Sequence, residues 1–66
     1  MTVRDLMSFV EEETFVMFEE PEAIGTLAAG IAPMDTDEIN DREVLSVDAS
    51  TLTASGRAVL CVVVKE

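Results

Sequence analysis

The first amphipathic pattern in the chain lies near its N-terminus and has helical spacing. Apolar residues follow the i, i+3, i+4, i+7 order of one helix face: Val3, Leu6, Met7 and Val10. Thr2 and Asp5 stand where a capping box needs them, so Thr2 should accept a hydrogen bond from the backbone of Asp5. Three glutamates at 11–13 then place negative charge where the helix dipole disfavours it. We therefore predict a short helix over residues 3 to about 11 with one face in the core.

Two strands are predicted after this helix. TFVMF, residues 14–18, is rich in β-branched and aromatic residues and ends in Glu-Glu-Pro, which is typical of a strand closed by a turn. In EAIGTLAAGIAP, residues 22–33, alanine and leucine permit a helix, but Gly25 and Gly30 would each cost about 1 kcal/mol in a helix interior. We favour a short bent strand paired with the first one, and a helix is the alternative.

A short helical turn is expected between the two halves of the chain. Pro33 can open one or two windings through residues 35–39, where acidic side chains suit the N-terminus of a helix. A β-hairpin should follow.

The first strand of that hairpin is EVLSVDA, residues 43–49, which alternates like a half-buried strand. Its odd-numbered apolar residues, including Leu45 and Val47, would share one face, and Val44 would lie on the other. A connection over residues 50–56 contains the turn signal Ser55-Gly56. The continuous apolar run AVLCVVV, residues 58–64, is typical of a central strand buried on both faces.

These elements predict the α+β class, with a single domain over residues 1–66. We expect a small, mostly antiparallel sheet of three to four strands and one N-terminal covering helix. One short helix cannot cover both faces of such a sheet. The apolar side chains left over on the Phe15 and Val62 strands therefore predict a homo-oligomer, most economically a symmetric dimer.

The size of the chain also favours association. In a domain of 66 residues, hydrophobic burial and ordering entropy nearly cancel. Cys61 is the one cysteine, so no internal disulfide can help, and its place in an apolar run predicts a buried structural thiol.

Charge narrows the choice of partner. Fourteen acidic residues against four basic ones give a net charge of −10, which repels nucleic acid and anionic membranes. We expect a basic protein surface as partner, with no direct nucleic-acid or membrane binding. Hydrophobic residues make up 48% of the chain, too many for a disordered acidic tail. No apolar run resembles a leader or is long enough to span a bilayer, so the expected compartment is the cytoplasm.

Enzyme chemistry has little support in the composition. The chain has no histidine, tyrosine or tryptophan, so the commonest general base is missing and neither a Ser-His nor a Cys-His pair can be built within one chain. Paired carboxylates could be drawn from the many acids, but nothing in the sequence identifies a pocket for them. We expect no enzyme activity and no cofactor.

The stretch MDTDEINDRE, residues 34–43, suggests a calcium loop, because Asp35, Asp37 and Asp41 are hard oxygen ligands. Its spacing fails that test. A loop of the EF-hand type starting at Asp35 would need an oxygen ligand where Ile39 stands, and a glycine where Asn40 stands. We therefore expect no specific metal site.

The alternative is that clustered carboxylates imitate the phosphates of a nucleic acid. Acidic clusters occur at residues 11–13, at 19–22 and at 35–41. The candidate partner-binding residues are Asp35, Asp37, Glu38, Asp41, Glu11, Glu12 and Glu13. These clusters could instead serve only to keep the protein soluble. A net charge of −10, however, exceeds the roughly 2 to 8 units that solubility needs.

The segments TVRDLMSFV, TFVMFEE and NDREVLSVDA, followed by a short terminal strand, resemble small uncharacterised accessory proteins of phages and prophages of Gram-positive bacteria. The resemblance rests above all on TVRDLM and DREVLSV. It implies a setting among host-takeover functions, where some small acidic proteins, including several anti-CRISPR proteins, occupy nucleic-acid channels of nucleases. An anti-defence inhibitor is thus the leading hypothesis. The alternatives are a structural or regulatory homo-oligomeric module and a small-ligand sequestering oligomer.

Overall fold

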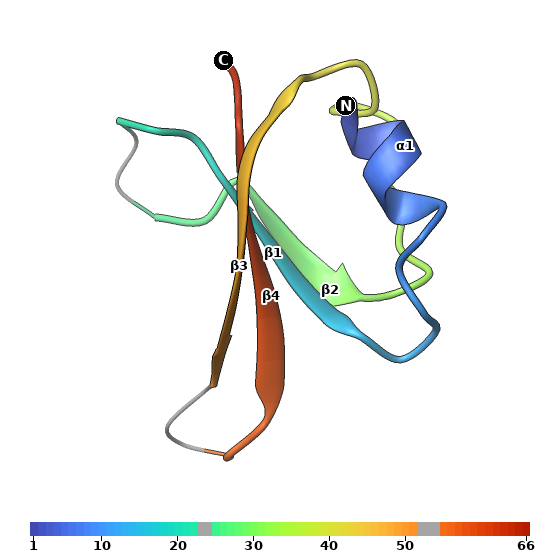
Figure 1. Cartoon of the computed structure of the whole chain (residues 1–66), viewed down its shortest axis with the longest axis vertical. Coiled ribbons are helices and arrows are strands. Elements are labelled where there is room, and N and C mark those ends of the chain that lie inside the picture. The colour runs from blue at the N-terminus through green and yellow to red at the C-terminus, as the bar shows by residue number, and fades with distance from the viewer. Residues whose placement is uncertain (23–24, 52–54) are drawn as a thin grey trace.

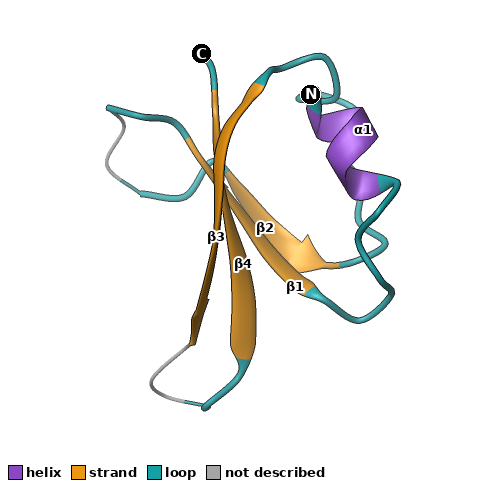
Figure 2. Ribbon diagram, in the orientation of Figure 1, coloured by secondary structure: helices purple, strands orange, loops and turns teal. Residues whose placement is uncertain are grey.

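A computed structural model describes residues 1–22, 25–51 and 55–66, and within them it confirms the α+β class. One short helix is followed by four strands: α1 (Val3–Met7), β1 (Phe15–Glu19), β2 (Ala28–Ile31), β3 (Val44–Thr51) and β4 (Ala58–Val64) (Figure 1, Figure 2). The strands form one sheet in the order β2-β1-β4-β3. Its two central strands, β1 and β4, run parallel, and both outer pairs are antiparallel. The sheet is therefore mixed and mostly antiparallel.

Helix α1 begins with the predicted capping box and ends earlier than predicted. The hydroxyl of Thr2 accepts from the backbone N–H of Asp5 at 3.2 Å, and the Asp5 carboxylate accepts from the N–H of Thr2 at 3.1 Å. The helix stops at Met7 instead of residue 11. The Ser8 hydroxyl donates to the Asp5 carbonyl at 2.6 Å, and the N–H of Phe9 turns to the Leu6 carbonyl. This local side-chain bond competes with the helical one and tightens the last turn.

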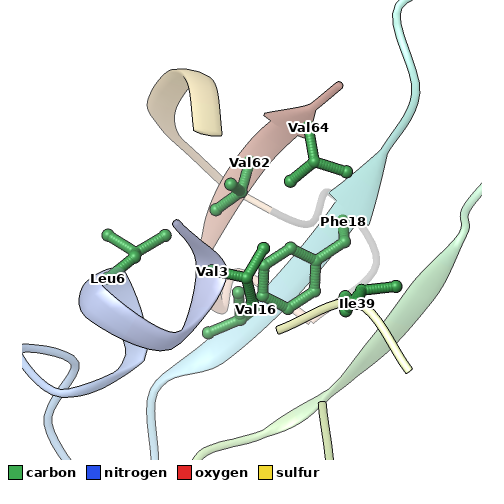
Figure 3. Packing of buried hydrophobic residues seen from close by; sticks show 7 residues of the cluster. All are labelled: Val3, Leu6, Val16, Phe18, Ile39, Val62 and Val64. Carbon is green, nitrogen blue, oxygen red and sulfur yellow. The ribbon is translucent and has the colours of Figure 1, made fainter. Parts of the chain in front are cut away.

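The core joins α1 to one face of the sheet and to the segment before β3. Its buried cluster consists of Val3, Leu6, Val16, Phe18, Ile39, Val62 and Val64 (Figure 3). Met7 and Val10 are partly buried and pack against this cluster. The predicted apolar stripe of the N-terminal segment is therefore confirmed. We call the sheet face that carries Val16, Phe18 and Val62 the core face.

Strand β3 carries a β-bulge that changes which of its side chains share a face. Val44 pairs with Val64, and Val47 pairs with Val62, with a register shift between Val44 and Ser46. Val44 and Val47 therefore lie on the same face, and the prediction that placed them on opposite faces is wrong. A bulge inserts one extra residue, which reverses the alternation beyond it. The strand is also less buried than predicted, since Val47 is 41% exposed.

The predictions for residues 22–33 and for the connection before the last strand are confirmed in part. β2 confirms the strand interpretation for residues 28–31, antiparallel to β1. Residues 23–24 of that predicted strand, and 52–54 of the predicted connection, lie outside the described residues. Gly56 has a φ of 68°, which suits the predicted turn before β4.

The segment 34–43 contains hydrogen-bonded turns in place of the predicted helical windings. The N–H of Ile39 donates to the Thr36 carbonyl at 2.9 Å, and the N–H of Arg42 donates to the Ile39 carbonyl at 3.0 Å. The Asp35 carboxylate accepts from the N–H of Asp37 at 3.0 Å. Such short-range side-chain bonds favour turns over a continuous helix. Within the described residues, no helix has the length and apolar character needed to cross a membrane.

Candidate functional site

Carboxylates from two distant parts of the chain gather at one end of the molecule. An open depression there is lined by Asp37, Glu38, Asp41, Arg42, Glu43, Lys65 and Glu66. We call the five carboxylates of this set the acidic end. They outnumber the two basic side chains in the depression, so the surface is strongly negative.

Backbone hydrogen bonds assemble the acidic end. The N–H of Val3 donates to the Arg42 carbonyl at 3.0 Å, and the N–H of Arg4 donates to the Asn40 carbonyl at 3.2 Å. The N–H of Lys65 donates to the Glu43 carbonyl at 2.8 Å, which joins the residue after β4 to the residue before β3. Residues 34–43, which we call the acidic segment, are thus fixed both to the start of α1 and to the end of the hairpin.

Burial of one apolar residue sets the direction of its acidic neighbours. Ile39 is 7% exposed and belongs to the core cluster, whereas Asp37, Glu38 and Asp41 are exposed. Beside Ile39, the buried hydroxyl of Thr36 donates to the side-chain oxygen of Asn40 at 2.6 Å. The segment therefore turns its carboxylates to solvent while Ile39 anchors it.

Two ion pairs touch this surface and differ in strength. The guanidinium of Arg42 donates to the Glu20 carboxylate at 2.9 Å, and the two side chains are 31% and 23% exposed. Arg4 and Asp41 are 3.8 Å apart, with exposed fractions of 70% and 95%. An ion pair this exposed is worth little. Because Arg42 is held by Glu20, it neutralises the acidic end less than its position suggests.

The structure brings together only part of the predicted partner-binding set. Asp37, Glu38 and Asp41 share the acidic end, and Asp35 lies beside it in a neighbouring depression that Glu38 also lines. The second predicted group is also exposed, but it lies apart from the acidic end. It consists of Glu11, Glu12 and Glu13.

That second group follows α1 at the end opposite the N-terminus (Figure 1). The N–H of Glu13 donates to the carbonyl of Ala32 at 2.7 Å, just after the end of β2. The two predicted groups are therefore separate clusters in the fold, as they are in the sequence.

Two members of the acidic end, Glu43 and Glu66, were missed by sequence reasoning. The predicted hairpin already contained the necessary signal, because antiparallel strands over residues 43–49 and 58–64 bring the first residue of one near the last of the other. The surface extends further to Glu22, which lines an adjoining depression with Pro21, Lys65 and Glu66.

One carboxyl group near this surface has a shifted pKa. The backbone hydrogen bond from Thr2 lowers the pKa of Asp5, and the Thr2 hydroxyl hydrogen bond lowers it further. This shift belongs to a helix cap and marks no catalytic group.

Within residues 1–22, 25–51 and 55–66, no cluster of three or more histidine, cysteine, aspartate or glutamate side chains is arranged to hold a metal ion. Cys61 is a free thiol and is half-buried on β4, so the prediction of a buried thiol is confirmed only in part.

Comparisons with protein-family models, with curated proteins and with solved structures find no match to this chain. The acidic end is thus the feature from which a function can be inferred.

Proposed function

We propose that this protein is a non-enzymatic binding protein that docks its acidic end onto a basic surface of another protein. The observation that carries the proposal is the convergence of Asp37, Glu38 and Asp41 with Glu43 and Glu66 on one open surface. Proteins that bind nucleic acid present rows of arginine and lysine matched to closely spaced phosphates. Carboxylates gathered on a small folded body are suited to occupy such rows.

The charge of the whole chain supports the same proposal. A net charge of −10 gives the molecule a long-range attraction for basic surfaces, and the acidic end concentrates part of that charge. At physiological salt the attraction is screened beyond about 8 Å, so the final contact depends on the local arrangement of carboxylates.

The acidic end is held in place by the fold, which favours a specific contact with a partner protein over a diffuse attraction between charges. We take α1 and the segment 34–43 to cover the core face together, with Ile39 and Val3 in one buried cluster. The carboxylates then project from a segment whose backbone is bonded to Val3, Arg4 and Lys65. Preorganisation of this kind lowers the entropic cost of binding.

The narrower form of the proposal is a phage anti-defence inhibitor that occupies the nucleic-acid-binding surface of a nuclease in the host cytoplasm. Its support is the resemblance of TVRDLM and DREVLSV to phage accessory proteins, together with the charge of the acidic end. No catalytic group is needed for such an inhibitor, because occupying the surface is enough.

Affinity capture with two charge-matched variants tests the proposal. One variant carries Asp37→Asn, Glu38→Gln and Asp41→Asn, and the control carries Glu11→Gln, Glu12→Gln and Glu13→Gln. Each has a net charge of −7, because three acids are removed from a chain of −10. Asn at position 37 keeps the oxygen that accepts from the Asn40 amide, so the local turn is preserved.

The captured proteins from a bacterial lysate are then compared for the wild type and both variants. The proposal expects a basic protein that the wild type and the control retain and that the acidic-end variant loses. Equal loss from both variants would show that only total charge matters, and equal retention by both would remove the acidic end as the binding surface.

A further inference from the structure

The side of the sheet opposite the core face has an apolar centre. Phe15 and Met17 on β1 alternate with the fully buried Val16 and Phe18, so they point to the other side. On β4, Cys61 and Val63 alternate in the same way with Val62 and Val64. We call this side the second face, and its central members are Phe15, Met17, Cys61 and Val63. Val59, the register partner of Phe15, lies on the same face and is already buried within the chain.

The exposure of these side chains differs from that of the core. All four are only half-buried, and Ile31 on the neighbouring strand β2 is 45% exposed. Ile31 is the register partner of Phe15, and the exposed Ala29 is that of Met17, so the apolar surface extends across β2. Side chains of this kind gain free energy when they leave water.

Charged residues are sparse on this face and lie at its margins. Arg57 places its guanidinium over the Phe15 ring, 5.9 Å from the centroid, at one end of β1. Glu19 lies at the other end of β1, in phase with Phe15 and Met17. Asp48 stands on the outer strand β3 as the register partner of Cys61. Most of the charge of this acidic chain is therefore located elsewhere.

We propose that a second copy of this chain packs on the second face, so that two sheets stack face to face in a symmetric dimer. The chain exposes more surface than a typical monomer of its size. The chain exposes 4511 Å², whereas a folded monomer of 7.2 kDa is expected to expose roughly 4,100 Å². The excess is in the direction expected of a subunit that buries surface in an assembly. Two sheets stacked in this way lie about 10 Å apart, with interdigitating side chains.

The charges at the margins select the orientation of the pair. If the two-fold axis runs along the strands, Glu19 meets its own counterpart and Arg57 does the same, which gives two repulsive contacts. If the axis runs across the strands, Arg57 of each copy meets Glu19 of the other, and both contacts are attractive. Asp48 then approaches its counterpart only at the solvated rim, where salt screens the repulsion. The second orientation makes the face complementary to itself, as a two-fold interface requires.

The same symmetry identifies the centre of the interface. Met17 and Cys61 are register partners, and each is the middle residue of its strand. Residues near a two-fold axis meet their own counterparts, so the two Cys61 thiols of the dimer should lie close together.

Sedimentation equilibrium of the wild type and of charge variants tests this dimer. The wild type at micromolar concentration should have about twice the mass of the 7.2 kDa chain. Glu19→Arg should raise the dimer dissociation constant about tenfold, and Arg57→Glu should do the same, because each turns two attractive contacts into repulsive ones. The double variant Glu19→Arg/Arg57→Glu should restore the wild-type value.

Glu12→Arg is the matched control, because it changes the net charge as much as Glu19→Arg at an exposed site outside the second face. Lower total charge alone favours association, so the control should not weaken the dimer. Circular dichroism of each variant confirms that it is folded. A folded wild-type monomer at all concentrations tested would overturn the proposal.

The reaction of Cys61 with a monofunctional maleimide provides a second measurement on the wild type. Cys61 should react more slowly as the protein concentration rises through the range of dimer formation, because the second copy covers it. A dimer that leaves this reaction rate unchanged and is insensitive to both charge variants would be formed elsewhere, for example along the exposed edge of β3, and would overturn the proposal.

Discussion

The guanidinium of Arg42 donates a 2.9 Å hydrogen bond to the carboxylate of Glu20, which joins the acidic segment to the end of β1 across 22 positions of the chain. Both side chains are mostly shielded from water, unlike those of the exposed pair Arg4–Asp41. Shielding makes the first pair a structural link and leaves the second nearly without energetic effect.

Glu20→Gln should therefore lower the free energy of unfolding by about 1 kcal/mol, because it weakens a charge-assisted hydrogen bond. Asp41→Asn is the control and should change the free energy by less than about 0.3 kcal/mol. Urea denaturation measures both. Similar values for the two variants would mean that Arg42 does not hold the segment.

The capping box gives a prediction about acid stability. The pKa of Asp5 is lowered in the folded protein from its ordinary value of 3.8, so the charged carboxylate is favoured by folding. This contribution is present above the ordinary pKa and is lost as the pH falls through the lower, folded value. Asp5→Asn should thus be less stable than the wild type at pH 6, and the difference should shrink below pH 3.8. Melting temperatures between pH 2 and pH 6 measure it, and a difference independent of pH would contradict this account.

Thr2→Ala tests the other half of the box without changing charge. It removes the hydroxyl that accepts from the N–H of Asp5, and loss of such a cap costs about 1 kcal/mol. Thr2→Ser keeps the hydroxyl and should restore most of the stability. Chemical denaturation of the two variants makes the comparison, and equal losses would show that the hydroxyl is not the cause.

Two phenylalanines distinguish core from surface. Phe18 is fully buried, whereas Phe9 is 79% exposed. Phe18→Ala removes a ring from the core, and its cost of about 3 to 5 kcal/mol is comparable to the whole stability of so small a domain. We expect that variant to be unfolded at 25 °C and Phe9→Ala to melt like the wild type. A cooperative melt of Phe18→Ala close to the wild-type temperature would contradict the assigned core.

Much of the fold follows from local sequence signals. The capping box, the apolar stripe at Val3 and Leu6 and the strand character of residues 58–64 depend on near neighbours in the chain, and all appear in the structure. The early end of α1 depends on one side-chain bond, from Ser8 to Asp5, which periodicity does not reveal.

The errors come from features with non-local causes. Strict alternation misplaced Val44 because it takes no account of a β-bulge, whose position depends on pairing with β4. The candidate site was found only in part, because the proximity of Glu43 and Glu66 depends on hairpin register and not on charge runs. The separation of Glu11–Glu13 from the acidic end likewise depends on where α1 directs the chain.

The association rate with the captured basic protein, measured over a range of salt concentrations, tests the central claim most directly. The acidic-end variant at Asp37, Glu38 and Asp41 should associate about tenfold or more slowly than the wild type at low salt, since steering changes such rates by 10 to 10³. The difference should shrink as salt rises. The control variant at Glu11–Glu13 also has a net charge of −7, because three acids are removed from a chain of −10. Its association rate should stay close to that of the wild type. Equal rates for the two variants at every salt concentration would contradict the claim that the acidic end is the binding surface.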